Sequence, residues 1–167
     1  MLILADLEKF DLSSLRHCTS AGEPLNPEVI RVWKEGTGLT ICEGYGQTET
    51  ACCVAAFPML ESRPGSMGKP SPGWKIEVHD DHGKPLGPHE EGRLAISCKP
   101  KPPGLIVEYI DNPEENKKSF VNNWYYTGDK VHYDDDGYFW FIGRDDDVIK
   151  SSGYRIGPFE VESALLE

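Results

Sequence analysis

The first third of the chain has the apolar spacing of an α/β crossover. Residues 2–9 are spaced like the end of a helix, and the apolar run at residues 15–18 predicts a short buried strand. Asn26 and Pro27 predict the start of a helix, because asparagine is a favoured N-cap and proline fits the first helical position. A second apolar run at residues 39–43 predicts another strand. The order strand, helix, strand with short links predicts one crossover in a parallel sheet.

From about residue 58 the pattern changes to short segments separated by proline and glycine. Residues 74–78 alternate between apolar and polar, residues 93–97 nearly do, and residues 138–142 are almost all apolar. Such segments are typical of strands. The pattern predicts a small, mostly antiparallel β unit, a distorted barrel, with one short helix at residues 113–120.

Acidic turns punctuate this second part of the chain. Residues 80–83 and 134–137 each end in glycine and predict hairpin turns. After Arg144, residues 148–156 predict a further hairpin, and Pro158 predicts the first turn of a helix. The fold class that follows is α/β, a piece of parallel sheet followed by the β unit.

Composition and charge narrow the function classes. A chain of 167 residues with 38% hydrophobic residues is long enough to bury a core. Its formal net charge of −11 argues against a nucleic-acid surface, which needs clustered lysine and arginine. The apolar segment at residues 1–5 is too short for a signal peptide, and an acidic residue already follows at position 6. No apolar stretch is long enough to span a bilayer. We therefore expect a cytoplasmic protein, or one of the mitochondrial matrix if its source is eukaryotic.

Cysteine and histidine spacing indicates neither disulfides nor a metal site. The five cysteines are odd in number and form no Cys-x-x-Cys, so we expect reduced thiols. His79 and His82 form a pair in a polar turn, which we interpret as surface histidines. Placing Gly137 at the sixth position of an EF-hand loop puts His132 and Gly143 where carboxylates are required, which excludes calcium binding of that type.

Residues 43–50 carry the densest candidate chemistry, because ligands of α/β sheets bind at the carboxyl ends of parallel strands. The glycines of this segment allow close backbone approach. Tyr45 offers a flat face to a purine, Thr48 a hydroxyl to a phosphate, and Glu49 a carboxylate to Mg²⁺. A polar surface loop would have the same composition, so both interpretations stay open on these residues alone.

Four motifs in a fixed order resemble those of AMP-forming acyl-CoA synthetases, members of the adenylate-forming enzyme superfamily. They are residues 20–25 (Ser-Ala-Gly-Glu-Pro-Leu), 45–50 (Tyr-Gly-Gln-Thr-Glu-Thr), 126–129 (Tyr-Thr-Gly-Asp) and the run at 143–162. Together they span nearly the whole chain, and their wording is most similar to the medium-chain branch. The resemblance implies that the chain is part of the large domain of such an enzyme, followed by the hinge and the start of its small domain.

The resemblance also implies roles for the first two motifs. Gly22, Glu23 and Pro24 would line the adenine and acyl-adenylate pocket, and Tyr45 would stack on the purine, with Gln47 in the same nucleotide site. In the same motif, Thr48 would contact the α-phosphate and Glu49 would bind the Mg²⁺ that accompanies ATP, which makes these two the expected catalytic residues.

The third and fourth motifs would complete the nucleotide site. Asp129 would accept hydrogen bonds from both ribose hydroxyls, and Arg144 would approach the same sugar. Without the resemblance, Asp129 is better explained as a turn residue after Gly128.

Gly44 and Gly46 would border the carboxylate pocket. In the acetate-activating relatives a tryptophan occupies the place of Gly46, so the glycine implies a pocket that extends past two carbons. The alternative is that Gly46 serves only the backbone conformation of the loop.

The remaining roles concern movement and CoA. Asp146 matches the hinge about which the small domain rotates, while Gly153 would pair with the pantetheine arm of CoA and Arg155 would approach a phosphate. The implied domains are residues 1–57, the end of the α/β subdomain; 58–145, the β-barrel subdomain; and 146–167, the hinge and the start of the small domain.

The implied function is an ATP-dependent acid:CoA ligase that forms acyl-AMP and then acyl-CoA, with ATP or AMP, Mg²⁺, CoA and a short or medium-chain carboxylic acid as its ligands. The chain resembles a fragment: the phosphate loop of the family would precede residue 1, and the adenylation lysine would follow residue 167. The fragment alone is expected to be inactive. Another adenylating branch, which activates aryl or amino acids, and an inactive nucleotide-binding module are the alternatives. The sequence does not predict an oligomeric state.

Overall fold

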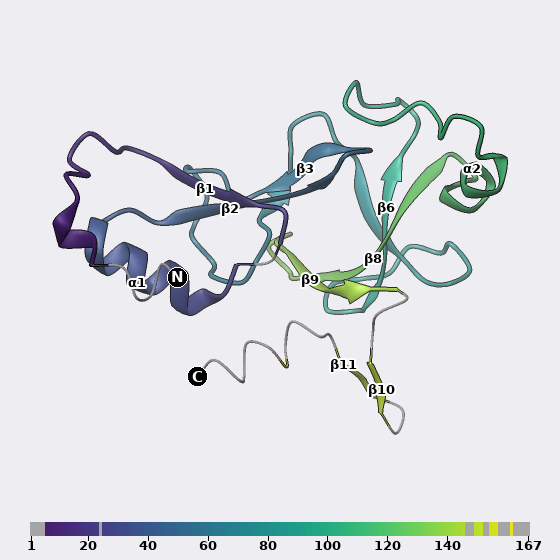
Figure 1. Ribbon diagram of the computed structural model, residues 1–167. Helices are drawn as coiled ribbons and strands as arrows, with labels where there is room; N and C mark the ends of the chain where they lie inside the picture. The colour runs from purple at the N-terminus through teal and green to yellow at the C-terminus, as the bar shows by residue number, and fades with distance from the viewer. Residues whose placement is uncertain (1–5, 24, 146–148, 152–153, 157–160, 162–167) are drawn as a thin grey trace.

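The computed structural model describes residues 6–23, 25–145, 149–151, 154–156 and 161, and shows two larger sheets and a two-stranded one (Figure 1). The first has the order β1-β2-β3-β4. Its elements are the 3₁₀ helix η2 (Leu7–Lys9), β1 (Cys18–Ala21), α1 (Pro27–Thr37), β2 (Ile41–Gln47), β3 (Ala51–Ala55) and β4 (Lys69–Pro70). The parallel pairing of β1 with β2 around α1 confirms the predicted crossover.

The local sequence explains where α1 begins and ends. The Asn26 side chain accepts a hydrogen bond from the Glu28 N–H at 2.8 Å, Pro27 is the first helical residue, and Gly38 caps the last turn. The predicted strand at residues 15–18 is wrong in position, because β1 begins only at Cys18. This edge strand is only half-buried, so its residues need not be apolar and an apolar run does not predict its position well.

The second sheet is antiparallel and is built around one long strand. It contains β5 (Ile76–His79), β6 (Gly92–Ser97), β7 (Phe120–Val121), β8 (Trp124–Tyr133) and β9 (Phe139–Arg144), with α2 (Pro113–Ser119) before β7. One edge of β8 pairs with β6, while β7 and β9 pair with its first and second halves. Backbone hydrogen bonds from Met67 and to Gly68 join Phe139 of β9 to the first sheet. The result is a half-barrel, as the sequence predicts.

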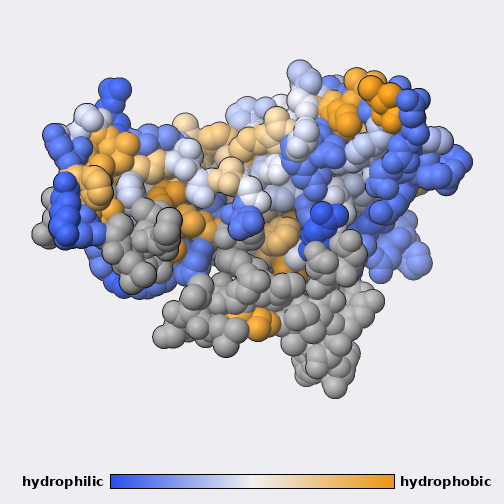
Figure 2. Space-filling view, viewed as in Figure 1, coloured by the Kyte–Doolittle hydropathy of each residue, from blue (hydrophilic) through white to orange (hydrophobic). Residues whose placement is uncertain are grey.

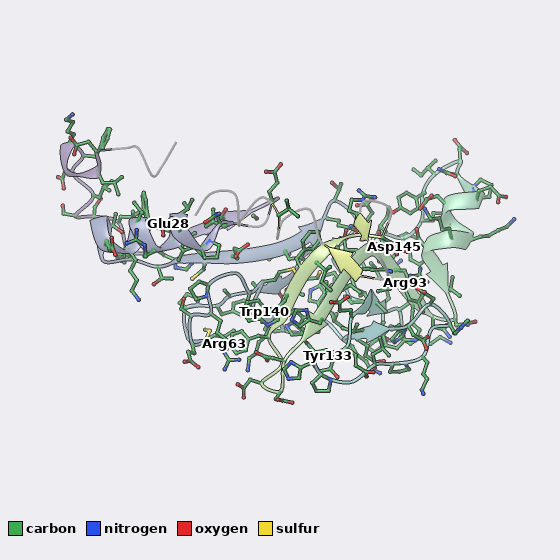
Figure 3. All side chains as sticks on the ribbon, turned by 90° about the horizontal axis from the view of Figure 1, so that it is seen from below. Glu28, Arg63, Arg93, Tyr133, Trp140 and Asp145 are labelled. Carbon is green, nitrogen blue, oxygen red and sulfur yellow. The ribbon has the colours of Figure 1, made fainter. Side chains whose placement is uncertain are left out.

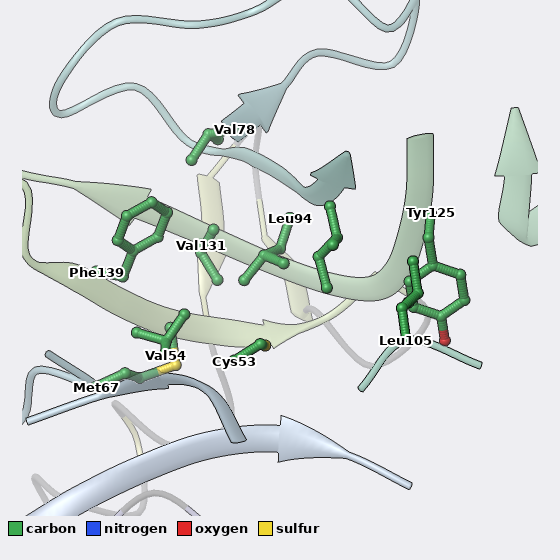
Figure 4. Close-up of a cluster of buried hydrophobic side chains, with 10 residues drawn as sticks. Cys53, Val54, Met67, Val78, Leu94, Leu105, Tyr125, Val131 and Phe139 are labelled. Atoms are coloured by element: carbon green, nitrogen blue, oxygen red, sulfur yellow. The ribbon is translucent and has the colours of Figure 1, made fainter. Parts of the chain in front are cut away.

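The core lies between the two sheets. Cys53 and Val54 of β3 face side chains of β6 and β8, among them Leu94 and Val131 (Figure 4). The ten buried residues of this cluster are Cys53, Val54, Met67, Val78, Leu94, Ile96, Leu105, Tyr125, Val131 and Phe139. Because the cluster draws on both sheets, it fixes β3 of the first sheet against β8 of the second.

Two further elements confirm sequence predictions. The turns at residues 80–83 and 134–137 close hairpins, the second between β8 and β9. An antiparallel pair, β10 (Ile149–Ser151) and β11 (Tyr154–Ile156), lies where the hairpin at 148–156 is predicted. The helix predicted from Pro158 lies outside the described residues, apart from the helical backbone of Val161.

His79 corrects the surface interpretation of the histidine pair. Its side chain is only 1% exposed, and its ring nitrogens lie 3.1 Å from the Tyr126 hydroxyl and 3.1 Å from a Glu77 carboxylate oxygen. Position 79 ends β5 and faces inward, whereas His82 is exposed in the turn. The polar turn therefore starts one residue later than the sequence suggests.

Apolar residues also reach the surface. Val107 and Ile110 are 79% and 83% exposed, and Figure 2 shows orange side chains over the segment that leads to α2. Within the described ranges, no helix has both the length and the apolar character that crossing a bilayer demands.

Candidate functional site

Two adjoining cavities gather most of the predicted site residues. The smaller has a volume of about 240 Å³ and the larger about 660 Å³. Gln47 and Arg144 line both, so the cavities share a wall. The smaller is lined by Gly22, Glu23, Glu43, Gly44, Tyr45, Gly46, Gln47, Met67, Asp129, Phe141 and Arg144. The larger is lined by Gln47, Thr48, Glu49, Arg93, Tyr109, Glu115, Lys118, Ser119, Tyr125, Tyr126, Thr127, Gly128, Arg144 and Asp145.

The parallel pair β1 and β2 supplies one wall of the smaller cavity. Ala21 pairs with Gly44, so Gly22 follows β1 beside the end of β2. This is the carboxyl end of the parallel strands, where ligands of such sheets bind. The segment predicted as a loop from residue 43 is, however, strand as far as Gln47, and only residues 48–50 form a turn.

The hairpin of β8 and β9 supplies the opposite wall. Asp129 pairs directly with Arg144 across the two strands, and the Asp145 N–H donates to the Gly128 carbonyl at 2.8 Å. Gly128 has a φ of +82°, a conformation that glycine adopts without a steric penalty. The interpretation of Asp129 as a mere turn residue is therefore wrong: it lies within β8.

Asp129 is the centre of a buried hydrogen-bond network. Only 5% of it is exposed, and one carboxylate oxygen accepts hydrogen bonds from the Tyr45 hydroxyl and, at 3.0 Å, from the Gln47 amide. The same amide donates to the Thr127 carbonyl at 2.9 Å. Burial, reinforced by the negative charge of Asp129, raises the pKa of Tyr45 well above its usual range. Tyr45 is thus a neutral donor that orients the carboxylate.

The network continues from Gln47 to Glu49 through two tyrosines. The Tyr125 hydroxyl donates to the Gln47 side-chain oxygen at 3.2 Å and lies 3.1 Å from the Tyr109 hydroxyl, which donates to Glu49 at 3.2 Å. Burial raises the pKa of both phenols. The sequence analysis missed both tyrosines. A strand at residues 124–133 would have indicated Tyr125, because alternate residues place it on the same face as Asp129.

Glu43 is a second carboxylate that the sequence analysis missed. It is 8% exposed, it lines the smaller cavity, and its side chain accepts the Leu25 N–H at 2.9 Å. Burial raises the pKa of Glu43, and the hydrogen bond from Leu25 opposes part of that rise. Glu43 therefore ties the backbone at Leu25, the last residue of the first motif, to β2.

Gly46 lines the smaller cavity for a different reason from the one expected. A Cβ added there would lie 1.6 Å from the Ala51 carbonyl oxygen, because β2 and β3 approach closely at a register shift. The absent side chain is required by the backbone of β3. The structure thus gives Gly46 a backbone role, and its role at a carboxylate pocket stays a prediction.

The larger cavity contains the residues expected to handle phosphate and metal. Thr48 and Glu49 both line it. The part of the chain that the structure describes has no group of three or more side chains suited to hold a metal ion. Mg²⁺ is commonly bound by one or two carboxylates together with substrate phosphates, so a single carboxylate fits this cation.

Other expected site residues fall beyond the structure. Pro24, Asp146 and Gly153 lie outside the described residues, and of Arg155 only the backbone in β11 is described. Their roles stay predictions.

Comparison with known proteins identifies the family. A family model described as AMP-binding enzyme matches residues 1–100. The mitochondrial acyl-coenzyme A synthetase ACSM3 of Rattus norvegicus is 54% identical over 100% of this chain and 29% of its own length. The 4-hydroxybutyrate–CoA ligase 1 of Metallosphaera sedula is 54% identical over 99% of this chain and 29% of its own length. The chain thus spans less than a third of these relatives.

Solved structures give the same picture. The anthranilate CoA ligase AuaEII in complex with anthranoyl-AMP matches with a TM-score of 0.89 and 39% identity, over 99% of this chain and 31% of that one. The O-succinylbenzoate coenzyme A synthetase MenE of Bacillus subtilis, in complex with ATP and magnesium, matches with a TM-score of 0.85 and 30% identity, over 99% and 34%. With a matching family model over more than half of its length, the chain belongs to the AMP-binding enzyme family.

Proposed function

We propose that the whole protein is an ATP-dependent acid:CoA ligase and that this chain supplies much of its nucleotide site. The observation that carries the proposal is the meeting of Asp129 with Tyr45 and Gln47 in a cavity that Gly22 and Arg144 also line. These residues come from all four sequence motifs and from both of the larger sheets. The relatives named above are CoA ligases, which favours this function over amino-acid activation or an inactive module.

The proposed reaction has two displacements. A carboxylate oxygen of the acid attacks the α-phosphorus of ATP, and the bond to pyrophosphate breaks, which gives acyl-AMP. The sulfur of CoA then attacks the acyl carbonyl, loses its proton to solvent, and AMP leaves. Both steps need the adenylate held in a fixed position, which is the main contribution of binding groups to such transfers.

This chain's residues would do the holding. Gly22 and Glu23 would border the base, and Asp129 would accept from the ribose hydroxyls with its carboxylate oriented by Tyr45 and Gln47. Arg144, paired across the strands with Asp129, would stand beside the sugar and the α-phosphate.

The larger cavity would take the phosphates. The Thr48 hydroxyl would donate to an α-phosphate oxygen, and Glu49, held by Tyr109, would bind Mg²⁺. When bound, the metal neutralises charge on the phosphates.

The hinge at Asp146 and the CoA contacts of Gly153 and Arg155 belong to the proposal through the family resemblance alone. The acid itself is proposed as a short or medium-chain fatty acid. For localisation, the mitochondrial alternative gains support from the names of the ACSM3 relatives, whereas the comparisons offer none for the cytoplasm.

The proposal is tested by acid-dependent exchange of pyrophosphate into ATP by the whole protein, followed by thioester formation on adding CoA. We expect exchange with butyrate, hexanoate or octanoate and none without an acid. ATP hydrolysis that no carboxylic acid stimulates would contradict a ligase. Exchange without any thioester would restrict the function to adenylation.

A further inference from the structure

Arg93 is a charged residue in the larger cavity that the proposed function does not use. It lies on β6, lines the cavity, and stacks its guanidinium 4.1 Å from the centre of the Tyr126 ring. Figure 3 shows Arg93 near Asp145, at the end of β9 that borders the same cavity. This contact restrains the guanidinium, whose planar fork of N–H donors suits an anion.

Arg93 has no anionic partner among the residues that the structure describes. Its Nε is buried without a hydrogen-bond partner, and no carboxylate oxygen of the described chain lies within 4.0 Å of it. A buried donor is rarely left unpaired in a folded protein, and an ion or ligand is a common explanation.

The acidic side chains of the cavity are engaged elsewhere. Asp145 pairs with Lys130 at 2.9 Å, Glu115 pairs with Lys118 at 3.8 Å and accepts from Ser119, and Glu49 accepts from Tyr109. None of these pairs involves Arg93, so Arg93 makes no ion pair with the described wall of the cavity.

The strand register adds a second, independent observation. Arg93 pairs directly with Lys130 of β8, so two cations stand opposite each other. Like charges in that position destabilise a sheet, and Lys130 is compensated by Asp145 while Arg93 is not. An anion bound at Arg93 would remove the imbalance.

We propose that Arg93 binds a diphosphate group in the larger cavity, with Lys118 at the mouth as a secondary cation. Arginine donates two parallel hydrogen bonds to phosphate oxygens, and Lys118 lines the same cavity from α2. The diphosphate could belong to the nucleotide or to CoA, and only that identification rests on the proposed function. The binding itself does not require adenylation.

The test measures binding of inorganic pyrophosphate to the 167-residue chain by calorimetry, with EDTA present so that side chains alone are probed. We expect Arg93→Gln to weaken binding about ten-fold, since a charge-assisted bidentate contact is lost. Arg93→Lys should recover part of the affinity, because the charge remains but the planar fork does not. Lys117→Gln is the matched control: it removes a cation from α2 that pairs with Glu114 and does not line the cavity.

Two comparisons identify the source of the diphosphate. If the diphosphate belongs to the nucleotide, the wild-type chain should bind ADP more tightly than AMP, and this difference in affinity should disappear in Arg93→Gln. If it belongs to CoA, the wild-type chain should bind dephospho-CoA more tightly than pantetheine, and that difference should disappear in the variant. If the wild-type chain binds pyrophosphate but not AMP, the result would count against the proposed function and not against the diphosphate site, because pyrophosphate carries no adenine.

A measurement on the unmodified chain covers the case in which Arg93→Gln does not fold. Pyrophosphate should protect Arg93, and not Arg31 on the exposed face of α1, from phenylglyoxal, as read by peptide mass spectrometry. Equal pyrophosphate affinity in a folded Arg93→Gln variant, or modification of Arg93 that pyrophosphate does not slow, would overturn the proposal.

Discussion

Two buried carboxylates, Asp129 and Glu43, give the smaller cavity its polar character, and each is tied to a different part of the fold. Asp129 is held by Tyr45 and Gln47, whereas Glu43 is held by the Leu25 N–H. The motif resemblance indicates Asp129. Glu43 lies next to a recognised motif but outside it, and nothing in the apolar pattern distinguishes a buried glutamate from an exposed one.

Asp129→Ala should weaken binding of AMP to the chain by about 2–4 kcal/mol, or roughly 30- to 700-fold, because two charge-assisted hydrogen bonds to the ribose would be lost. Calorimetric titration measures this directly. Asp135→Ala, which removes an exposed carboxylate paired with His89, should leave the affinity unchanged. An unaltered affinity in Asp129→Ala would remove this residue from the nucleotide site.

Glu43 should make stability depend on pH in a defined direction. Burial raises its pKa above the unfolded value of 4.5, so its stabilising contribution is fully present below that value and is lost as pH rises through the folded pKa. Glu43→Gln can still accept the Leu25 N–H but does not ionise. The variant should match the wild type near pH 4 and be the more stable of the two at pH 7.

Urea unfolding at several pH values between 4 and 7 would measure this difference. A stability difference between Glu43→Gln and the wild type that stays constant over that range would show that the carboxyl does not titrate as argued.

Among the elements, β8 shows most clearly what the pattern of apolar and polar residues leaves out. Its residues Thr127, Asp129 and Lys130 are polar and buried, so the strand does not alternate as a half-buried strand should. The crossover, β6, β9 and α2 follow from local signals, because each has a recognisable apolar run or helix cap even though it also carries residues that line the cavities. Where a strand buries polar side chains, the pattern of apolar and polar residues no longer predicts the strand.

Gly46 provides an element-scale prediction. Gly46→Ala should destabilise the chain by about 2–4 kcal/mol or prevent folding, because the new methyl group would meet the β3 carbonyl of Ala51. Gly87→Ala is the control, since its Cβ would meet only the flexible end of Glu90. Thermal unfolding followed by circular dichroism is the measurement. A Gly46→Ala protein as stable as the control would mean that β3 moves aside readily and that its backbone does not require a glycine at position 46.

For the whole molecule, the two larger sheets share one core, and residues from both sheets line the two cavities. The relatives are more than three times as long as the matched region, which covers 29% of each. Sequence motifs identify the family, and most of the site residues that they predict meet in the two cavities; apolar spacing alone would not have indicated these side chains.

The 167-residue chain should therefore bind AMP without catalysing acid-dependent exchange between pyrophosphate and ATP. Positioning of the triphosphate and neutralisation of its charge supply most of the rate in such transfers. We expect the residues of this chain alone to be insufficient for either. Radiolabelled pyrophosphate exchange with hexanoate measures this, with the whole protein as the positive control. Robust exchange by the chain alone would contradict the expectation that catalytic parts lie beyond it.

The tyrosine chain between Gln47 and Glu49 has a consequence that follows from counting protons. The Gln47 amide nitrogen faces two acceptors, so its oxygen must receive the Tyr125 proton. Tyr109 then has a single proton to share between the Tyr125 hydroxyl and the Glu49 side-chain oxygen. A cation at Glu49 would compete for that carboxylate and turn the Tyr109 hydroxyl toward Tyr125. A cation that binds Glu49 in the larger cavity would thus affect Tyr125 and, through it, Gln47 in the wall that both cavities share. Only one hydroxyl would rotate, and no strand would have to move.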